Sequence, residues 1–326
     1  MTAKPKVEIL TFTDPFCSWC WAMEPVIYRA KETYRDQLRI RPVMGGLVPD
    51  MAHFTDPLNG ISSTADVAPH WEEVGLRTGQ PIDGTFMREN QDPHWGTWPA
   101  CIAASAAALQ GDDLGEAFLR RLRRAAQAEG RNASNPEVYL AIAEATPGLD
   151  LDRFKAAIAD GTAERAFQED RQLGAQVRVR SFPTLLLMNT NADLQIRPIL
   201  MGGARDFKTL QDVLSQVAPD LKPHAPRPLT ELLAEYGALT TRELSELLDK
   251  PISELLAELE GQDGIRKVPV RTGEFWELGQ ADVPTLGKSL LTDLVSWEDG
   301  GMACDMETGV CGPVSAEPAK TEVARS

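Results

Sequence analysis

The sequence lacks any uninterrupted apolar stretch of about 18 residues, so we expect no transmembrane helix. Its first residues, 1–6, carry no apolar region of the kind that is cleaved from secreted proteins. Basic residues are also few: 33 Lys and Arg stand against 48 Asp and Glu, a net charge of −15. Nucleic acids and anionic membranes select basic surfaces, so we expect neither as a partner. Together these absences predict a cytoplasmic protein.

Cysteine is scarce, with five residues in a chain of 326. Structural disulfides are rare in the reducing cytoplasm, so we expect these thiols to be redox-active, metal-bound or buried. Hydrophobic residues make up 43% of the chain, which is enough for a large core. The length favours two domains.

Two of the cysteines, Cys17 and Cys20, form a C-x-x-C motif between a strand pattern and a helix pattern. Residues 7–12 are rich in strand formers, and apolar residues recur near helical spacing in 21–30. Unpaired N–H groups and the macrodipole at a helix N-terminus favour a thiolate. We therefore expect Cys17 to have a lowered pKa and to be the nucleophile, with Cys20 as the resolving thiol.

The same spacing also occurs in zinc sites, where two Cys supply half of the ligands. A complete site needs two more ligands, and the next cysteine pair, Cys304 and Cys311, lies at the far end of the chain. We predict no metal and no cofactor at the C-x-x-C motif.

A proline, Pro183, precedes the second apolar strand pattern, which runs from Leu185 to Met188. In a buried strand, proline is tolerated only at the first residue or at an edge. From the residues alone the bond before Pro183 is cis or trans, and trans is the commoner state.

Taken together, these segments resemble the DsbA family of thioredoxin-fold proteins. The resemblance is strongest to its branch without a signal sequence, which includes FrnE-like proteins and YjbH-type adapters. It covers about the first 220 residues. The residues that carry it are Phe12-Thr13-Asp14-Pro15-Phe16-Cys17-Ser18-Trp19-Cys20-Trp21, Glu24-Pro25, Trp98-Pro99-Ala100-Cys101 and Ser181-Phe182-Pro183-Thr184.

This resemblance implies that Pro183 is cis and that the backbone of Phe182 can pair with a substrate. Ser18 and Trp19, between the two cysteines, are the further candidates for substrate contact. They also mark a departure, because strongly oxidising members of the family have Pro-His there. Without a histidine to stabilise the thiolate, a very oxidising potential is not expected.

The predicted fold class is α/β: a thioredoxin fold with a large all-helical insertion, plus a small C-terminal α+β, winged-helix-like domain. Helical periodicity predicts that residues 150–173 form one helix of the insertion. The helix predicted at residues 252–260 is acidic, so we expect the small domain to contact protein rather than DNA. The predicted divisions are residues 1–222 with the insertion at about 50–174, 223–297 for the small domain, and 298–326 for a flexible tail.

Several other residues have two interpretations each. Glu24 could accept a proton from Cys20 if burial raised its pKa, or it could be a surface carboxylate. Cys101 lies among alanines and could be a third redox thiol, but it is expected to be a small buried hydrophobe. The arginines at 120, 121, 123 and 124 could suggest an anion site, but they are expected to form a solvated helix face.

The tail carries a second cysteine pair, Cys304 and Cys311, in a C-x6-C arrangement. It could act as a shuttle dithiol that reaches the first pair. It could also bind a soft metal such as Cu(I) together with Met302 and Met306. The third possibility is that both thiols stay reduced and idle.

From these observations we predict a protein-disulfide oxidoreductase. Cys17 attacks a substrate disulfide, the mixed disulfide lies beside Phe182 and Pro183, and Cys20 releases the substrate. The expected partners are proteins with disulfides or dithiols and a thiol reductant such as glutathione or thioredoxin. The alternatives are an adapter that presents a client to a protease and, less favoured, a glutathione-dependent isomerase or transferase.

Overall fold

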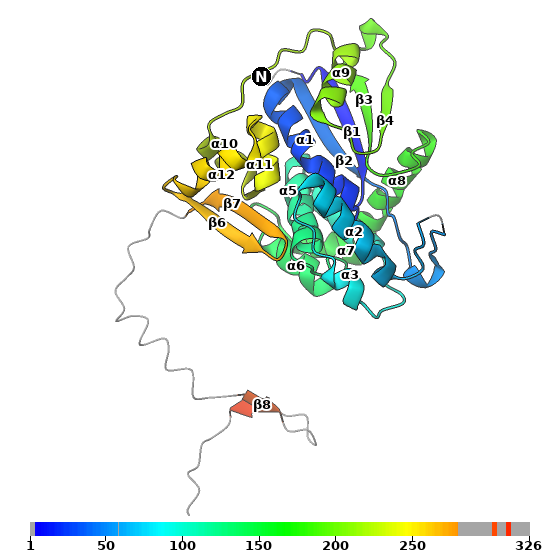
Figure 1. Ribbon diagram of the computed structural model, residues 1–326. Helices are drawn as coiled ribbons and strands as arrows, with labels where there is room; N and C mark the ends of the chain where they lie inside the picture. Colours follow the sequence, from blue (N-terminus) through cyan, green and yellow to red (C-terminus); the bar gives the residue numbers. More distant parts are fainter. Residues whose placement is uncertain (1–3, 58, 280–301, 305–310, 314–326) are drawn as a thin grey trace, which may run out of the picture. The chain divides into compact units, whose positions relative to one another are not determined.

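The first unit of the chain is built on a four-stranded sheet (Figure 1). The computed structural model describes residues 4–57, 59–279, 302–304 and 311–313, and the chain divides into units at residues 1–278 and 279–326. The sheet has the order β2-β1-β3-β4, with β1 parallel to β2 and every other pair antiparallel. Its strands are β1 (Val7–Thr13), β2 (Leu38–Met44), β3 (Thr184–Asn189) and β4 (Ile199–Gly202).

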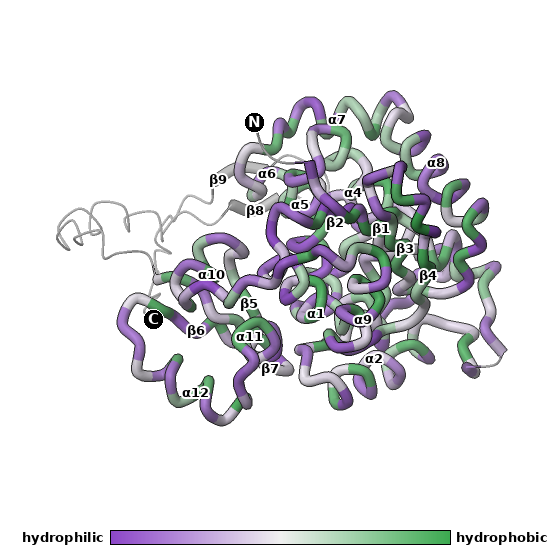
Figure 2. Tube along the Cα trace, turned by 90° about the horizontal axis from the view of Figure 1, so that it is seen from above, coloured by the Kyte–Doolittle hydropathy of each residue, from purple (hydrophilic) through white to green (hydrophobic). Residues whose placement is uncertain are grey.

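Both faces of this sheet are covered, because alternate residues of β1 and β3 enter different clusters. Val7, Ile9, Leu185 and Leu187 pack with α1 (Ser18–Tyr34) and α9 (Phe207–Val217) on one face. Leu10, Phe12 and Leu186 pack on the other with residues that follow the last helix of the insertion. Green stretches of β1 and β3 between the helices show this apolar interior in Figure 2. Burial on both sides explains the continuous apolar run of β3 from Leu185 to Met188.

An all-helical segment separates β2 from β3, as predicted. The stretch expected to form one helix, residues 150–173, is divided into two, because Gly161 has a positive φ of 76° between them. The helices are α2 (Thr64–Thr78), α3 (Thr85–Glu89), α4 (Trp98–Ala108), α5 (Asp112–Arg123) with a π-helical turn at Arg124–Ala128, α6 (Pro136–Glu144), α7 (Leu151–Ala159) and α8 (Thr162–Gln176).

Residues 229–278, which we call the C-terminal module, form a small antiparallel sheet with helices. The strand order is β5-β7-β6. Its apolar cluster includes Tyr28 of α1, so the module packs directly on the thioredoxin part. Figure 1 shows its helices in yellow beside α1. Its elements are α10 (Leu229–Tyr236), β5 (Leu239–Thr240), α11 (Thr241–Leu248), α12 (Ile252–Glu260), β6 (Ile265–Val270) and β7 (Gly273–Leu278).

In the second unit the structure describes two short strands, β8 (Met302–Cys304) and β9 (Cys311–Pro313). They pair antiparallel, with Cys304 directly opposite Cys311. No helix within the described ranges is long and apolar enough to cross a membrane.

Candidate functional site

The C-x-x-C motif lies at the start of α1, and Cys17 is the N-cap residue of that helix. The backbone N–H of Cys20 donates to the Cys17 sulfur at 3.3 Å and to the Cys17 carbonyl at 3.0 Å. Both thiols are free and buried, with 7% of Cys17 and 4% of Cys20 exposed. The motif therefore has the geometry of a dithiol, but little of either cysteine reaches solvent.

Burial acts against the lowered pKa expected for Cys17, whose role as the nucleophile stays a prediction. Burial raises the pKa of Cys17 well above the ordinary value, and the neighbouring Cys20 sulfur adds to the effect. Burial also opposes ionisation of Cys20, but the hydrogen bond from Cys17 and the positive charge of Arg123 outweigh it, so the pKa of Cys20 is lowered. The predicted helix-terminus effect on Cys17 is thus overcome by the loss of solvation.

Directly before the motif, Asp14 organises the loops around it. Its carboxylate accepts from the backbone N–H of Phe16 at 2.8 Å and of Leu47 at 2.7 Å, and from the Thr97 hydroxyl at 2.7 Å. The buried Cys101 thiol also donates to it, at 3.4 Å, which agrees with Cys101 being a small buried residue. Burial raises the pKa of Asp14 despite these donors. The sequence offers little sign of this role.

The second motif lies close to the first, because Cys20 and Pro183 line the same cavity. The Phe182–Pro183 peptide bond is cis, as the resemblance implied. The Phe182 ring lies against Gly45, just after β2, where a Cβ atom would overlap the ring. Gly45 thus leaves room for the Phe182 ring beside the site, a role that depends on this tertiary contact.

Ser18 and Trp19 differ in accessibility. Ser18 is buried and Trp19 is partly exposed. The guanidinium of Arg77, on α2, lies over the Trp19 ring at 5.4 Å from its centroid. Of these two, Trp19 has the more accessible surface for contact with another molecule, and its predicted role in binding stays a prediction.

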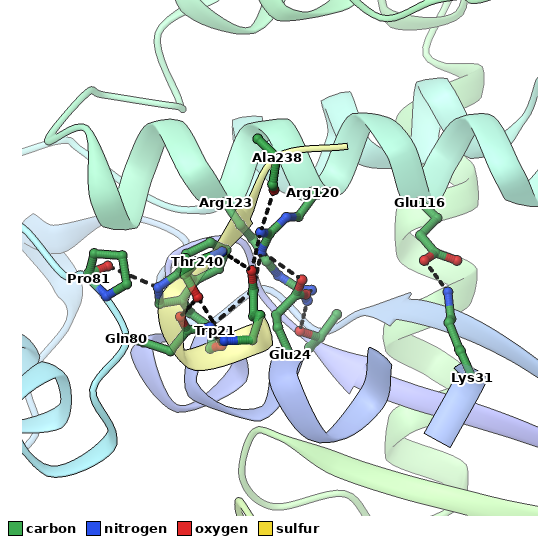
Figure 3. A network of polar contacts seen from close by, with 12 residues as sticks. Trp21, Glu24, Lys31, Gln80, Pro81, Glu116, Arg120, Arg123, Ala238 and Thr240 are labelled. Atoms are coloured by element: carbon green, nitrogen blue, oxygen red, sulfur yellow. Dashed lines mark hydrogen bonds and ion pairs between the residues drawn. The ribbon is translucent and has the colours of Figure 1, made fainter. Parts of the chain in front are cut away.

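Glu24, Arg120 and Arg123 form an ionic network (Figure 3), and all three line the same cavity as Cys20. Glu24 pairs with Arg123 and, at 3.2 Å, with Arg120, both on α5. Burial opposes the charge on Glu24, but these two arginines outweigh it and lower its pKa. Glu24 is therefore buried and not a surface carboxylate, and its pKa is lowered where a raised one was expected; its predicted role as a proton acceptor for Cys20 stays a prediction.

Two of the four arginines on this helix also depart from the expected solvated face. Arg123 is buried and the side chain of Arg120 is only 11% exposed, since each places its guanidinium among carboxylates inside the fold. Arg121 is exposed and Arg124 is partly exposed, as expected for a helix surface. Arg120 and Arg123, one turn apart, share the buried face of α5.

For the tail cysteines, the structure describes only backbone. Their direct opposition across β8 and β9 brings the pair together, while residues 305–310 between them lie outside the described residues. The predicted accessory roles of Cys304 and Cys311 stay predictions. Within the described ranges, no group of three or more His, Cys, Asp or Glu residues is arranged to hold a metal ion.

Comparison with known proteins identifies the family. A family model described as thioredoxin matches residues 10–203. The chain belongs to the thioredoxin family. Among solved structures, this thioredoxin-family protein resembles a candidate protein disulfide isomerase from Nitrosomonas europaea, with a TM-score of 0.52 and 24% identity over 64% of this chain and 96% of that one. A DsbA oxidoreductase candidate from Streptomyces coelicolor gives 0.50 and 17% over 68% and 93%. These likenesses confirm the predicted DsbA-like thioredoxin fold.

Curated relatives match more of this thioredoxin-family protein. The ClpXP adapter protein SpxH of Shouchella clausii is 30% identical over 288 residues, which cover 85% of this chain and 90% of the relative. The protein of the same name from Bacillus subtilis is 28% identical over 278 residues, with 84% and 90% covered. The prediction of an oxidoreductase as the main function is therefore wrong: relatives that share most of the chain carry the name of an adapter.

Proposed function

We propose that this thioredoxin-family protein is an adapter that presents client proteins to a ClpXP protease. The observation that carries the proposal is the extent of the match to the adapters. A match over 85% of the chain cannot fit within residues 1–203, which are less than two thirds of it, so it extends into the C-terminal part. The structures named for disulfide chemistry cover 64% and 68%. The adapters thus share a larger part of the architecture.

The chemistry of the dithiol supports this proposal. A thiolate is the nucleophile in disulfide exchange, and the pKa of Cys17 is raised by burial. A thiol of which only 7% is exposed is a poor entry point for a protein substrate. The pair can still close to a disulfide, so the adapter would be redox-sensitive. An adapter for an intracellular protease has protein partners and works in the cytoplasm. This is the compartment that the sequence predicts.

The test compares protein turnover in strains that lack this protein or ClpX. We expect a set of proteins to become long-lived in both strains, as measured by pulse labelling and mass spectrometry. Complementation with the Cys17→Ser/Cys20→Ser double variant should restore their degradation, because presentation needs surface contacts and no thiol. Two unrelated sets of stabilised proteins, or restoration by the wild type alone, would contradict the proposal.

A further inference from the structure

The ionic network that shares a cavity with Cys20 reaches the C-terminal module. Glu24 pairs with both arginines, and Arg120 donates from Nη1 and Nη2 to the two carboxylate oxygens of Glu243, each at 2.7 Å. Glu243 belongs to α11 of the module. Cys20 lines one cavity together with Arg123, Glu24 and Arg120, and the ion pairs continue from these groups to Glu243, more than 200 residues further along the sequence.

Glu243 also anchors the module locally. Its carboxylate accepts from the backbone N–H of Thr240 at 2.8 Å, which completes the capping box of α11. Gln80, in the loop after α2, donates to it at 3.2 Å. Arg120 donates in addition to the carbonyl of Ala238, just before β5, at 3.2 Å. Figure 3 shows how these contacts meet at the same point between α5 and the module. A shift of Arg120 must therefore alter the anchoring of the module.

The balance of charge in this interior depends on the thiols. Arg120 and Arg123 are balanced by Glu24 and Glu243, and each of these four side chains is at most 11% exposed. A thiolate at Cys20 leaves one negative charge in excess. Water screens such buried charges poorly, so the excess acts over several ångströms. The Arg123 guanidinium then interacts with two negative groups, the Glu24 carboxylate and the Cys20 thiolate.

We propose that Glu243 is a positioning residue that couples the redox state of the dithiol to the docking of the C-terminal module. It acts through Arg120 and Glu24, which determine how strongly the Arg123 guanidinium interacts with Cys20. This coupling would regulate the redox-sensitive adapter proposed above. Only its biological role rests on the adapter function, because the coupling itself is a property of the purified protein. The ionisable groups that act on Cys20 are Cys17, the N-cap residue of α1, and Arg123 on α5, and Glu24 of α1 pairs with that arginine.

Oxidation by glutathione disulfide gives the coupling its direction. A cysteine thiolate of the pair attacks one glutathione sulfur and releases one glutathione thiolate. The second cysteine then loses its proton, attacks the mixed disulfide and releases the other glutathione, so two thiols are oxidised and one glutathione disulfide is reduced. The negative charge beside Arg123 disappears. Arg123 then interacts with Glu24 alone. Arg120 is therefore shared less with Glu24 and pairs more strongly with Glu243, so the module docks more tightly in the oxidised form.

By linkage, Glu243 must disfavour the reduced form of the dithiol. Glu243→Gln keeps an oxygen for the capping contacts but removes the competing negative charge. We expect the equilibrium of purified protein with reduced and oxidised glutathione, read by alkylation and mass spectrometry, to shift toward the dithiol by about threefold to tenfold. The pKa of Cys20, read from thiolate absorbance in a Cys17→Ser background, should fall as well.

The matched control is Glu258→Gln on α12, because Glu258 pairs with Lys250 inside the module itself. It should leave both readouts unchanged. Equal shifts in the two variants, or no shift in either, would overturn the proposal.

A measurement on the wild type needs no variant to fold. Hydrogen exchange of residues 229–278 should be slower in the oxidised than in the reduced protein, and identical protection in the two states would equally overturn the coupling. Because neither experiment contains a protease or a client, its failure leaves the adapter function untouched. A failure of the adapter test, conversely, says nothing about these equilibria.

Discussion

Gly45 and Phe182 form a residue-scale contact beside the candidate site. The Phe182 ring occupies the space where a side chain at position 45 would begin. Gly45→Ala should therefore displace the ring toward solvent and lower the free energy of unfolding by about 1–3 kcal/mol. Urea unfolding gives the energy, and the ring resonances of Phe182 report its movement.

The control for this substitution is Gly202→Ala at the end of β4. A Cβ atom there would meet its nearest neighbour, the Thr184 hydroxyl oxygen, at 3.8 Å, an ordinary contact distance. Its effect should be clearly smaller. Equal losses for the two alanines, or an unmoved Phe182 ring in Gly45→Ala, would show that the close approach is unimportant.

The thiols show which residue properties the sequence can predict. The C-x-x-C spacing and its strand-to-helix junction are local, and both were predictable. The pKa order of Cys17 and Cys20 was not, because it depends on burial and on Arg123, which comes from a helix about 100 residues further along. Likewise, Arg120 and Glu243 are 123 positions apart, and no local pattern pairs them.

At the scale of elements, Glu32 fastens α1 to the segment before the C-terminal module. This buried carboxylate accepts from the backbone N–H of Arg227 at 2.9 Å and from its guanidinium at 2.8 Å. Burial would raise its pKa, but the hydrogen bonds and charge of Arg227 lower it below the ordinary value. The folded state thus binds this proton less tightly than the unfolded state does.

The stability due to Glu32 should be complete above the unfolded carboxyl pKa of about 4.3 and lost as pH falls through the folded value. Glu32→Gln should be less stable than the wild type at pH about 7 and should lose less stability on acidification. Urea unfolding at several pH values measures this. The comparison is Glu235→Gln, which removes a more exposed partner of the same arginine and should cost little. Parallel acid curves for wild type and Glu32→Gln would show that this carboxylate does not contribute in that way.

The β8–β9 pair provides a second prediction at this scale. Residues directly opposite in an antiparallel pair have Cα atoms about 4.5–5.5 Å apart, which suits a disulfide. We expect Cys304 and Cys311 to form one in glutathione disulfide, seen as a loss of two hydrogens in the C-terminal peptide. The bond should persist in the Cys17→Ser/Cys20→Ser variant. A peptide that gains two glutathione adducts instead would show that the pairing does not hold.

Element boundaries were predictable where the local pattern was clear, as for α12, whose limits match the expected range 252–260. The predicted single helix at 150–173 failed because one glycine, Gly161, adopts a left-handed conformation. Its composition alone does not distinguish a break from a tolerated helix glycine.

At the scale of the whole molecule, the C-terminal module decides how the protein should be understood. A local redox motif predicts chemistry, and it led to the expectation of an enzyme. The module adds a surface that the motif does not need, and it packs on α1 through Tyr28 and Arg29. Relatives named as adapters match across this part of the chain as well. Fold could be predicted from the motifs, whereas the proposed function rests on the extent of the match to the relatives.

Degradation reconstituted from purified components tests the adapter function most directly. The reaction contains ClpXP from the same organism, ATP, and a protein that becomes long-lived when the adapter is absent. Full-length wild type and the Cys17→Ser/Cys20→Ser variant should both accelerate its degradation, by about tenfold or more. If neither accelerates it, and the wild type instead reduces insulin disulfides in a reaction that needs Cys17, the protein is a disulfide reductase and not an adapter.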